Sequence, residues 1–255
     1  MSSLVSILVP VYNGARYLAP ALTSCLEQSH RELEVVVVDD ASTDGSLALA
    51  REFERRDARV RVLARGENGG ISRALNDGLR AARGDYLTRL AQDDGFRPDA
   101  IAYLVAALER MPEAGLVYGN MMIIDGAGQP IHPLIMAPPE RVLFPANRLG
   151  LYAMWRRAVW EKVGDFCSAC DTAEDYDYWL RVSRHFPLRK AGEEIPFYFR
   201  YHPEQGSVRS EHRQRIATRR ALLRYWWAEW KDRPLNPYPF IKMTRAAVSL
   251  VREKG

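Results

Sequence analysis

The sequence predicts an α/β protein with a mainly parallel, doubly wound sheet and a helical extension at its C-terminal end. Two observations lead to this prediction. Up to residue 125, short apolar runs rich in β-branched residues alternate with segments of helical spacing, a pattern typical of sheets covered by helices. The run at residues 33–38 contains four consecutive valines, as in strands that are buried on both faces.

The first part of the chain divides into four strand–helix pairs. Helical spacing places Tyr17, Leu18 and Ala21 on one side of the first helix. Asp44 belongs to a cap region before the second helix, and Pro98 stands in the first turn of the fourth, where proline is favoured. We therefore expect strands at residues 5–11, 33–38, 60–63 and 86–90, and helices at residues 16–28, 44–56, 71–82 and 98–110.

The pattern changes near residue 125. Strand material at residues 116–118 and 121–124 precedes a turn at Gly126 and Gly128, and a proline-rich loop is expected at residues 130–145. Helices at residues 158–163 and 173–185 follow, then a strand at 194–201 and helix from residue 210. We predict a domain of residues 1–205, with halves 1–125 and 126–205, and a basic helical tail of residues 206–255.

The N-terminal segment reads as a buried first strand. It lacks the basic region and the small-residue cleavage site of a signal peptide, and Pro10 interrupts its apolar run. The chain contains no run of about 18 uncharged apolar residues that would span a membrane. These observations predict a cytoplasmic protein.

Three cysteines occur in the chain: Cys25, Cys167 and Cys170. They do not form a disulfide framework. The CxxC at Cys167 and Cys170 has no second pair to complete a structural zinc site, and it is expected in a loop rather than at the start of a helix. We therefore expect the cysteines to be incidental.

Charge is distributed unevenly along the chain. Residues 206–255 hold 12 Lys or Arg and 4 Asp or Glu, a net +8, whereas the whole chain carries +4, so the other residues carry −4. A basic tail on a mildly acidic body predicts that the tail meets an anionic partner.

Polar residues follow three of the expected strands, where the carboxyl ends of parallel strands form a ligand edge. The first strand ends in PVYNG, the second in DDASTDG with Asp39 and Asp40, and the fourth in AQDDG with Asp93 and Asp94. Neither GxGxxG nor a P-loop is present, so a divalent cation is expected to handle phosphates. Asp residues also cap helices and shape turns, and Asp44 is assigned to that role.

These segments resemble those of glycosyltransferase family 2, which has the GT-A fold. The matching stretches are SILVPVYNGARYL, VVVVDDASTDGS, ENGGISRALNDGL, GDYLTRLAQDDGFRPD, AEDYDYWLRV and FRYH, in family order over about residues 4 to 205. The resemblance implies an inverting, metal-dependent transfer of a sugar from a nucleotide-sugar donor, a UDP- or dTDP-sugar, to an acceptor hydroxyl. Residues 1–125 would bind the donor and residues 126–205 the acceptor.

The resemblance also implies a role for individual residues. Tyr12 would stack on the nucleobase and Asp40 would accept a hydrogen bond from it. Mn²⁺ or Mg²⁺ would be bound by Asp93 and His202, although Ala91 stands where the family often has a first Asp. Asp175 would be the catalytic base, with Glu174 beside it. The predicted donor-binding residues are Pro10, Val11, Tyr12, Asn13, Asp39, Asp40, Arg73, Gln92 and Asp94.

Sugar transfer by single displacement needs a base for the acceptor hydroxyl and no protein nucleophile. Glu174 and Asp175 open an expected helix, whose N-terminus should keep the pKa of Asp175 modest. An ordinary acidic first turn is the alternative interpretation. Asp177 should face elsewhere and is a poor substitute.

Two other functions remain as alternatives. A nucleotidyltransferase would need a glycine-rich loop after the first strand, which is missing. A catalytically weak scaffold that binds nucleotide sugar or glycan would be compatible with Ala91. The expected acceptor is a glycan or a lipid-linked molecule of cell-surface polysaccharide synthesis.

The tail has an apolar stripe with Leu223, Trp226, Trp227 and Trp230, surrounded by arginines. The segment 213–230 would suit an anionic membrane surface on the inner face of the membrane. Packing on the catalytic domain or a homodimer contact is the alternative. Nucleic acid is not an expected partner, because no binding motif accompanies the charge.

Overall fold

Valine-rich strands form the centre of a seven-stranded sheet in the computed structural model of the chain, which describes residues 3–139, 143, 147, 149, 152–170, 172–205, 211–232 and 242. Neighbouring strands of this sheet pair in parallel, except that β9 is antiparallel to both of its neighbours, β4 and β6. The order across the sheet is β10 (Leu188–Lys190), β6 (Leu116–Tyr118), β9 (Ala153–Arg156), β4 (Tyr86–Arg89), β1 (Val5–Val11), β2 (Leu33–Asp39) and β3 (Val60–Ala64).

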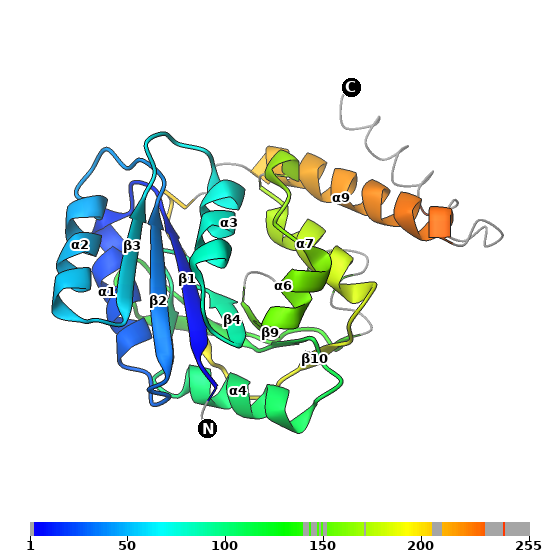
Figure 1. Cartoon of the computed structure of the whole chain (residues 1–255), viewed down its shortest axis with the longest axis horizontal. Helices are drawn as coiled ribbons and strands as arrows, with labels where there is room; N and C mark the ends of the chain where they lie inside the picture. The colour runs from blue at the N-terminus through cyan, green and yellow to red at the C-terminus, as the bar shows by residue number, and fades with distance from the viewer. Residues whose placement is uncertain are drawn as a thin grey trace.

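Helices cover both faces of this sheet, as predicted for a doubly wound fold (Figure 1). On one side lie α1 (Ala15–Leu26), α2 (Ser46–Arg56) and α4 (Ala100–Arg110). On the other lie α3 (Ile71–Ala81), α6 (Arg157–Val163) and α7 (Glu174–Ser183). The β3-β2-β1-β4 order gives the first half its Rossmann-like topology.

Two strands of the sheet, β9 and β10, were not predicted from the sequence. Both are short, and β9 contains the buried residues Met154 and Trp155 without an alternating pattern. Trp155 packs against Trp179 of α7 with ring centroids 5.4 Å apart. Tertiary pairing, which a short sequence window does not encode, therefore decides these two strands.

A second sheet has four strands in the order β5-β11-β7-β8. The expected loop at residues 130–145 is wrong for its first part, because Pro130–Leu134 pairs with β7 as a strand. Proline is tolerated there since β8 is the sheet's edge strand; of the rest of that range, several residues lie outside the described part. The strands are β5 (Gly95–Phe96), β11 (Phe197–Arg200), β7 (Met121–Ile124) and β8 (Pro130–Leu134).

The tail contains one long helix, α9 (Glu211–Asp232), which lies across α7 (Figure 1). Ala221 is buried in the main hydrophobic core, and Arg184 forms ion pairs with Glu229 and Asp232 of α9. Among the described residues, no helix is long and apolar enough to cross a membrane.

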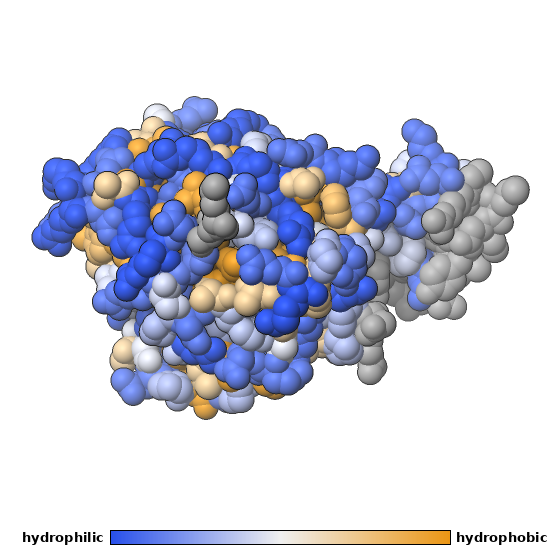
Figure 2. Space-filling view, turned by 60° about the horizontal axis from the view of Figure 1, so that its bottom comes forward, coloured by the Kyte–Doolittle hydropathy of each residue, from blue (hydrophilic) through white to orange (hydrophobic). Residues whose placement is uncertain are grey.

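The outer surface is mostly hydrophilic on the face drawn in Figure 2, where apolar residues occur in small groups. The apolar side chains of the strands lie inside, and Ile7, Val35, Val37 and Leu87 are all fully buried. Burial of this kind is the main driving force of folding. It fixes the sheet whose carboxyl edge carries the polar loops.

Candidate active site

The loops after β1 and β2 are joined by hydrogen bonds at the carboxyl edge of the sheet. Asn13 has a φ of 50°, its backbone N–H donates to Ser42 Oγ at 3.0 Å, and its Oδ1 accepts from Thr43 N–H at 2.8 Å. Ala15 N–H donates to Asp44 Oδ2 at 3.1 Å, and Ser46 N–H donates to Asp44 Oδ1 at 2.9 Å. These bonds hold the two polar loops in one fixed arrangement.

Asp40 is buried just after β2, and its carboxylate binds the backbone of the turn at Gly69 and Gly70. Its two carboxylate oxygens accept from Gly69 N–H at 2.9 Å and Gly70 N–H at 2.8 Å, and Arg65 Nε lies 2.8 Å from Oδ1. Gly70 has a φ of 83°, which favours glycine at this position. Asp40 thereby places the first turn of α3 beside the ends of β1 and β2.

Asp39 presents an unusual carboxylate beside Asp40. Its Oδ2 accepts from Ser42 N–H at 3.1 Å. Its Oδ1 is buried and has no hydrogen-bond partner in the part of the chain that the structure describes. Buried polar atoms usually have a partner, so Asp39 Oδ1 is an acceptor whose hydrogen-bonding capacity the described residues leave unused.

The other predicted donor-binding residues surround these loops. Tyr12 has 46% of its surface exposed, whereas the side chain of Val11 is buried in the core. Pro10 is half-buried, and Arg73 is exposed on the first turn of α3. Tyr12 and Arg73 therefore have accessible side chains, while Val11 supports the strand from within.

Gln92 joins the loop after β4 to the end of β1. Tyr12 N–H donates to Gln92 Oε1 at 2.8 Å, and Gln92 Nε2 donates to the Tyr12 carbonyl at 3.1 Å. A Cβ at Gly14 would lie 2.3 Å from Gln92 Cδ, so this contact requires glycine. The amide of Gln92 thus sets the distance between the first strand and the acidic loop.

Asp93 and His202 come together although 109 positions separate them in the sequence. His202 Nε2 lies 2.9 Å from Asp93 Oδ2. His202 Nδ1 is buried without a hydrogen-bond partner among the described residues, and the imidazole packs on Tyr17 with ring centroids 4.8 Å apart. The predicted metal residues are therefore adjacent at the edge of both sheets.

This pair offers the atoms that a divalent cation needs. Asp93 supplies a carboxylate oxygen and His202 an imidazole nitrogen, a combination suited to Mn²⁺ more than to Mg²⁺, which prefers oxygen alone. Ala91 offers no ligand, but its carbonyl accepts from Asp94 N–H at 3.2 Å and closes the turn that presents Asp93. If Asp93 and His202 both bind the ion, they would leave its other positions to phosphate oxygens and water.

Asp94 faces inward, in contrast to Asp93. Its Oδ2 accepts a hydrogen bond from the Tyr152 hydroxyl, and its Oδ1 accepts from Arg200 N–H at 2.7 Å. Burial, together with the charge of Asp93, raises the pKa of the Asp94 carboxyl well above its usual range. These contacts brace the loop, and the predicted donor-binding role of Asp94 stays a prediction.

Glu174 and Asp175 occupy the first turn of α7 and are both buried. Glu174 Oε1 pairs with Arg89 Nη1 at 3.3 Å, while Asp175 Oδ2 accepts from Asn147 Nδ2 at 2.8 Å. Asp177 points elsewhere, since its carboxylate pairs with Arg181 at 2.9 Å and with Arg224 at 3.1 Å. Asp177, the third acid of this turn, therefore contacts other partners than Asp175 does.

The pKa of Asp175 is not modest, and the prediction based on the helix N-terminus alone was wrong. Burial and the neighbouring charge of Glu174 raise the pKa of Asp175 to about 7. The charge of Arg89 and the hydrogen bonds from Tyr176 N–H and Asn147 act in the opposite direction but do not cancel this rise. Desolvation and a like charge thus outweigh the helix terminus.

Three residues of this region were missed in the sequence: Arg89, Tyr152 and Arg200. Arg89 is fully buried at the end of β4 and pairs with Glu174. Arg200 donates from Nε to the Asp93 carbonyl at 2.8 Å, besides its N–H bond to Asp94. The one sequence signal was a charged residue, Arg89, inside the expected strand YLTRL, since a buried charge is normally paired.

The cysteines were expected to be incidental, but two of them are paired in the structure. Cys167 and Cys170 form a disulfide, and Cys25 is a free, buried thiol. The short helix η1 (Ser168–Cys170) brings the two Cα atoms to 5.3 Å, within the range that a disulfide spans. The predicted loop is thus a tight turn that closes on itself.

Comparison with known proteins agrees with this arrangement. The profile described as glycosyl transferase family 2 matches residues 6–227. An uncharacterised glycosyltransferase of Rickettsia conorii is 30% identical over 263 residues, covering 97% of this chain and 42% of the relative. The chain therefore spans less than half the length of that relative.

Two solved structures share the fold. Residues 1–349 of TarS from S. aureus, in complex with UDP-GlcNAc, give a TM-score of 0.72 at 19% identity and cover 88% of this chain and 65% of that chain. Mannosyltransferase PcManGT from Pyrobaculum calidifontis, in complex with GDP-Man and Mn²⁺, gives 0.68 at 24% identity, over 98% of this chain and 70% of that one. These likenesses confirm the predicted GT-A fold.

Proposed function

The chain belongs to glycosyl transferase family 2, and we propose that it is an inverting enzyme that uses a UDP- or dTDP-sugar. As a nucleotide-sugar glycosyltransferase, it needs a donor site, a means of stabilising the leaving diphosphate, and a base for the acceptor. The observation that carries the proposal is Asp175. It is a buried carboxylate with a pKa of about 7 at the start of α7, and a pKa near the working pH is what a general base requires.

The donor site in this proposal lies over the ends of β1 and β2. Tyr12 stacks on the nucleobase, and the free acceptor Asp39 Oδ1 bonds a base or ribose donor group. Asp40, already bonded to Gly69 and Gly70, keeps lone pairs for the base. Arg73, exposed beside Gly70, is then available for the phosphates.

The leaving diphosphate is proposed to lie near Asp93 and His202. These two residues would hold Mn²⁺ or Mg²⁺, which supplies electrostatic stabilisation of the charge that builds on the diphosphate. Arg200 and Asp94 position the loop from beneath, through the bonds to the Asp93 carbonyl and the β11 backbone. Gln92 fixes the same loop to β1.

Asp175 is proposed to remove the proton of the acceptor hydroxyl as its oxygen attacks the anomeric carbon. Glu174 pairs with Arg89, and its negative charge raises the affinity of Asp175 for that proton. Asn147 orients the carboxylate through Oδ2. The step needs no covalent sugar–enzyme intermediate, so the anomeric centre inverts.

The acceptor is proposed to be a glycan or a lipid-linked molecule of cell-surface polysaccharide synthesis. The outward side of α9 supports a membrane-bound acceptor. Ala221 faces the core, whereas Trp227 is 53% exposed and Arg213 and Arg220 are exposed as well. A tryptophan flanked by arginines suits an anionic membrane surface, which would place the protein at the inner face of the membrane.

The proposal is tested by incubating the chain with UDP-, dTDP- and GDP-sugars, Mn²⁺ and glycan acceptors, and measuring the released nucleoside diphosphate. We expect transfer from a UDP- or dTDP-sugar. Asp175→Asn should reduce transfer by about 10²- to 10⁴-fold, the usual contribution of a general base, while donor binding remains.

Glu161→Gln, an exposed acid on the neighbouring helix α6, is the matched control and should leave transfer unchanged. Transfer by Asp175→Asn at the wild-type rate would refute the base assignment. Donor binding by the wild-type chain without any turnover would favour the alternative of a catalytically weak binding scaffold.

A further inference from the structure

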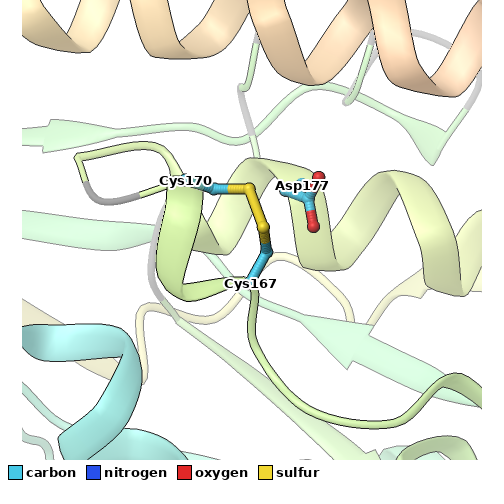
Figure 3. Close-up of side chains that lie close together, drawn as sticks. All are labelled: Cys167, Cys170 and Asp177. Atoms are coloured by element: carbon cyan, nitrogen blue, oxygen red, sulfur yellow. A yellow bond between two sulfur atoms is a disulfide. The ribbon is translucent and has the colours of Figure 1, made fainter.

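The disulfide between Cys167 and Cys170 lies directly before the helix that carries Glu174 and Asp175. Figure 3 shows the sulfur–sulfur bond beside the carboxylate of Asp177 on α7. Cys170 N–H donates to the Cys167 carbonyl at 3.0 Å, and Ala173 N–H donates to the Cys170 carbonyl at 2.9 Å. The disulfide turn therefore connects directly to the N-cap of α7.

One arm of this turn is held by α3. Asn76 clamps Phe166 on both sides, because its Nδ2 donates to the Phe166 carbonyl at 2.9 Å and its Oδ1 accepts from Phe166 N–H at 2.8 Å. Ser72 Oγ donates to the Cys167 carbonyl at 3.2 Å. Because the sulfur–sulfur bond joins Cys170 to Cys167, the position of Cys170 is also restrained by these bonds from α3.

The segment that follows Cys170 leads into α7 and contains a residue with an unfavourable backbone conformation. Thr172 has a φ of 79°, which is uncommon for a β-branched residue. Such a backbone persists where its surroundings over-determine it, and the disulfide is the covalent restraint nearest to Thr172. Opening the disulfide would leave the link between Cys170 and Glu174 less restrained.

Arg224 of α9 completes the surroundings of the sulfur atoms. Its Nη2 lies 2.7 Å from Cys170 Sγ and 3.1 Å from Asp177 Oδ1. Sγ of both cysteines and a carboxylate oxygen of Asp177 lie within 4.8 Å of one another, as in a metal site. A guanidinium already contacts two of these atoms, so the arrangement favours thiol chemistry over a bound cation.

We propose that Cys167–Cys170 is a thiol–disulfide exchange site, and that its reduction lowers the rate of sugar transfer by releasing the start of α7. The effect on transfer rests on the proposed role of Asp175. The exchange itself does not, because it depends only on the two cysteines and Arg224.

The exchange begins at Cys167, which is half-buried, whereas Cys170 is 2% exposed. A thiolate of a dithiol reductant attacks Cys167 Sγ, forms a mixed disulfide, and expels Cys170 as a thiolate. The Arg224 guanidinium stabilises that thiolate, and a better leaving group speeds exchange. The second thiol of the reductant then closes its own disulfide and releases Cys167, so two electrons pass from the reductant to the cysteine pair.

Reduction should act on transfer through the position of Asp175. A displacement of about 1 Å at a reacting group can cost roughly 100-fold in rate. The bonds from Asn76 and Ser72 survive reduction, so the turn loosens without unfolding the domain. We therefore expect a decrease of about 10- to 100-fold in transfer, with donor binding on the other loops retained.

The test compares the full chain in its oxidised form and after treatment with dithiothreitol. Alkylation and mass spectrometry count the free thiols, and nucleoside diphosphate release reports transfer. We expect two additional reactive thiols, slower transfer, and recovery of the oxidised rate after reoxidation. Cys167→Ser with Cys170→Ser should stay at the reduced rate in both conditions, whereas Cys25→Ala should respond like the wild-type chain. Arg224→Gln should slow the reduction itself.

The outcomes separate this inference from the proposed function. Transfer at equal rates in both redox forms, or a double serine variant as fast as the oxidised chain, would overturn the inference and leave the function intact. Absence of transfer in both forms would refute the proposed function. The alternative that Cys167, Cys170 and Asp177 bind a metal ion is tested by titrating the reduced chain with Zn²⁺. Binding of one Zn²⁺ per chain by the wild type, and of none by the double serine variant, would also overturn the inference.

Discussion

At the scale of single residues, Asp175 illustrates how neighbours set the chemistry of a carboxyl group. It lies in the first turn of a helix, a position that stabilises negative charge, and Asn147 donates a hydrogen bond to it. Burial and the charge of Glu174 act against ionisation and raise the pKa to about 7. The result is a group that both binds and releases a proton near neutral pH.

A pH profile of kcat/KM tests this environment. Because the pKa of Asp175 is raised to about 7, its basic form is lost as the pH falls through 7, and the rate should then decrease about tenfold for each pH unit. Glu174→Gln removes the like charge and should move the midpoint to lower pH. A flat profile between pH 5 and 8 in the wild-type chain would exclude Asp175 as the titrating base.

Asp93→Ala is predicted to weaken donor binding in the presence of Mn²⁺, because the change removes the carboxylate of the Asp93–His202 pair. Binding without metal should change little. Isothermal titration with UDP, with and without Mn²⁺, measures both. Glu109→Gln, an exposed acid on α4, is the control, and equal Mn²⁺-dependent affinities of Asp93→Ala and the wild type would remove Asp93 from the metal site.

At the scale of elements, β4 links the two halves of the candidate site. Its last residue, Arg89, pairs with Glu174 at the start of α7, and the loop that follows presents Asp93 to His202 after β11. β1 lies beside β4 in register, with Leu8 opposite Arg89. One strand end therefore sets the relative positions of the proposed base and the proposed metal residues.

Removal of Arg89 tests this link. Arg89→Met leaves Glu174 buried without its ion-pair partner, and breaking one side of a buried pair typically costs about 3–5 kcal/mol of folding free energy. Urea unfolding of the variant measures the loss. The double variant Arg89→Met with Glu174→Met should recover most of the stability, since no unpaired charge remains. A single variant as stable as the wild type would show that the pair does not hold α7.

At the scale of the whole molecule, α9 packs on α7 and the main hydrophobic core. The sequence left domain packing and membrane contact as alternatives for this helix. Its face with Ala221 packs into the core and its Arg224 reaches Cys170 and Asp177, while Trp227 and Arg220 lie on an exposed side. The helix therefore packs through Ala221 and the tip of Arg224 and leaves Arg220 and Trp227 exposed.

Vesicle co-sedimentation tests the exposed side. The chain should bind vesicles that contain phosphatidylserine and bind phosphatidylcholine vesicles much less. Arg213→Glu with Arg220→Glu should weaken binding by at least roughly tenfold, since basic residues near an anionic surface each add attraction. The matched control is Arg31→Glu with Arg55→Glu, two exposed arginines outside α9. Equal binding of the two double variants would end the membrane proposal.

The amino-acid sequence by itself determined the order of most strands and helices and the family resemblance. Apolar periodicity predicts local elements, and the strand-end motifs are contiguous segments such as those around Asp40 and Asp93. It also singled out Asp93, His202, Glu174 and Asp175, whose roles stay predictions. The strands β1, β2 and β3 needed no further information because each of them buries its own valines.

Only the tertiary structure decided which distant groups meet. The pairing of β9, the buried partners Arg89 and Tyr152, and the disulfide of Cys167 with Cys170 all depend on contacts that no local pattern encodes. The same holds for the pKa of Asp175, which the helix terminus alone predicted wrongly. Burial and a neighbouring charge set that pKa, and both are properties of the packed molecule rather than of the segment that contains the residue.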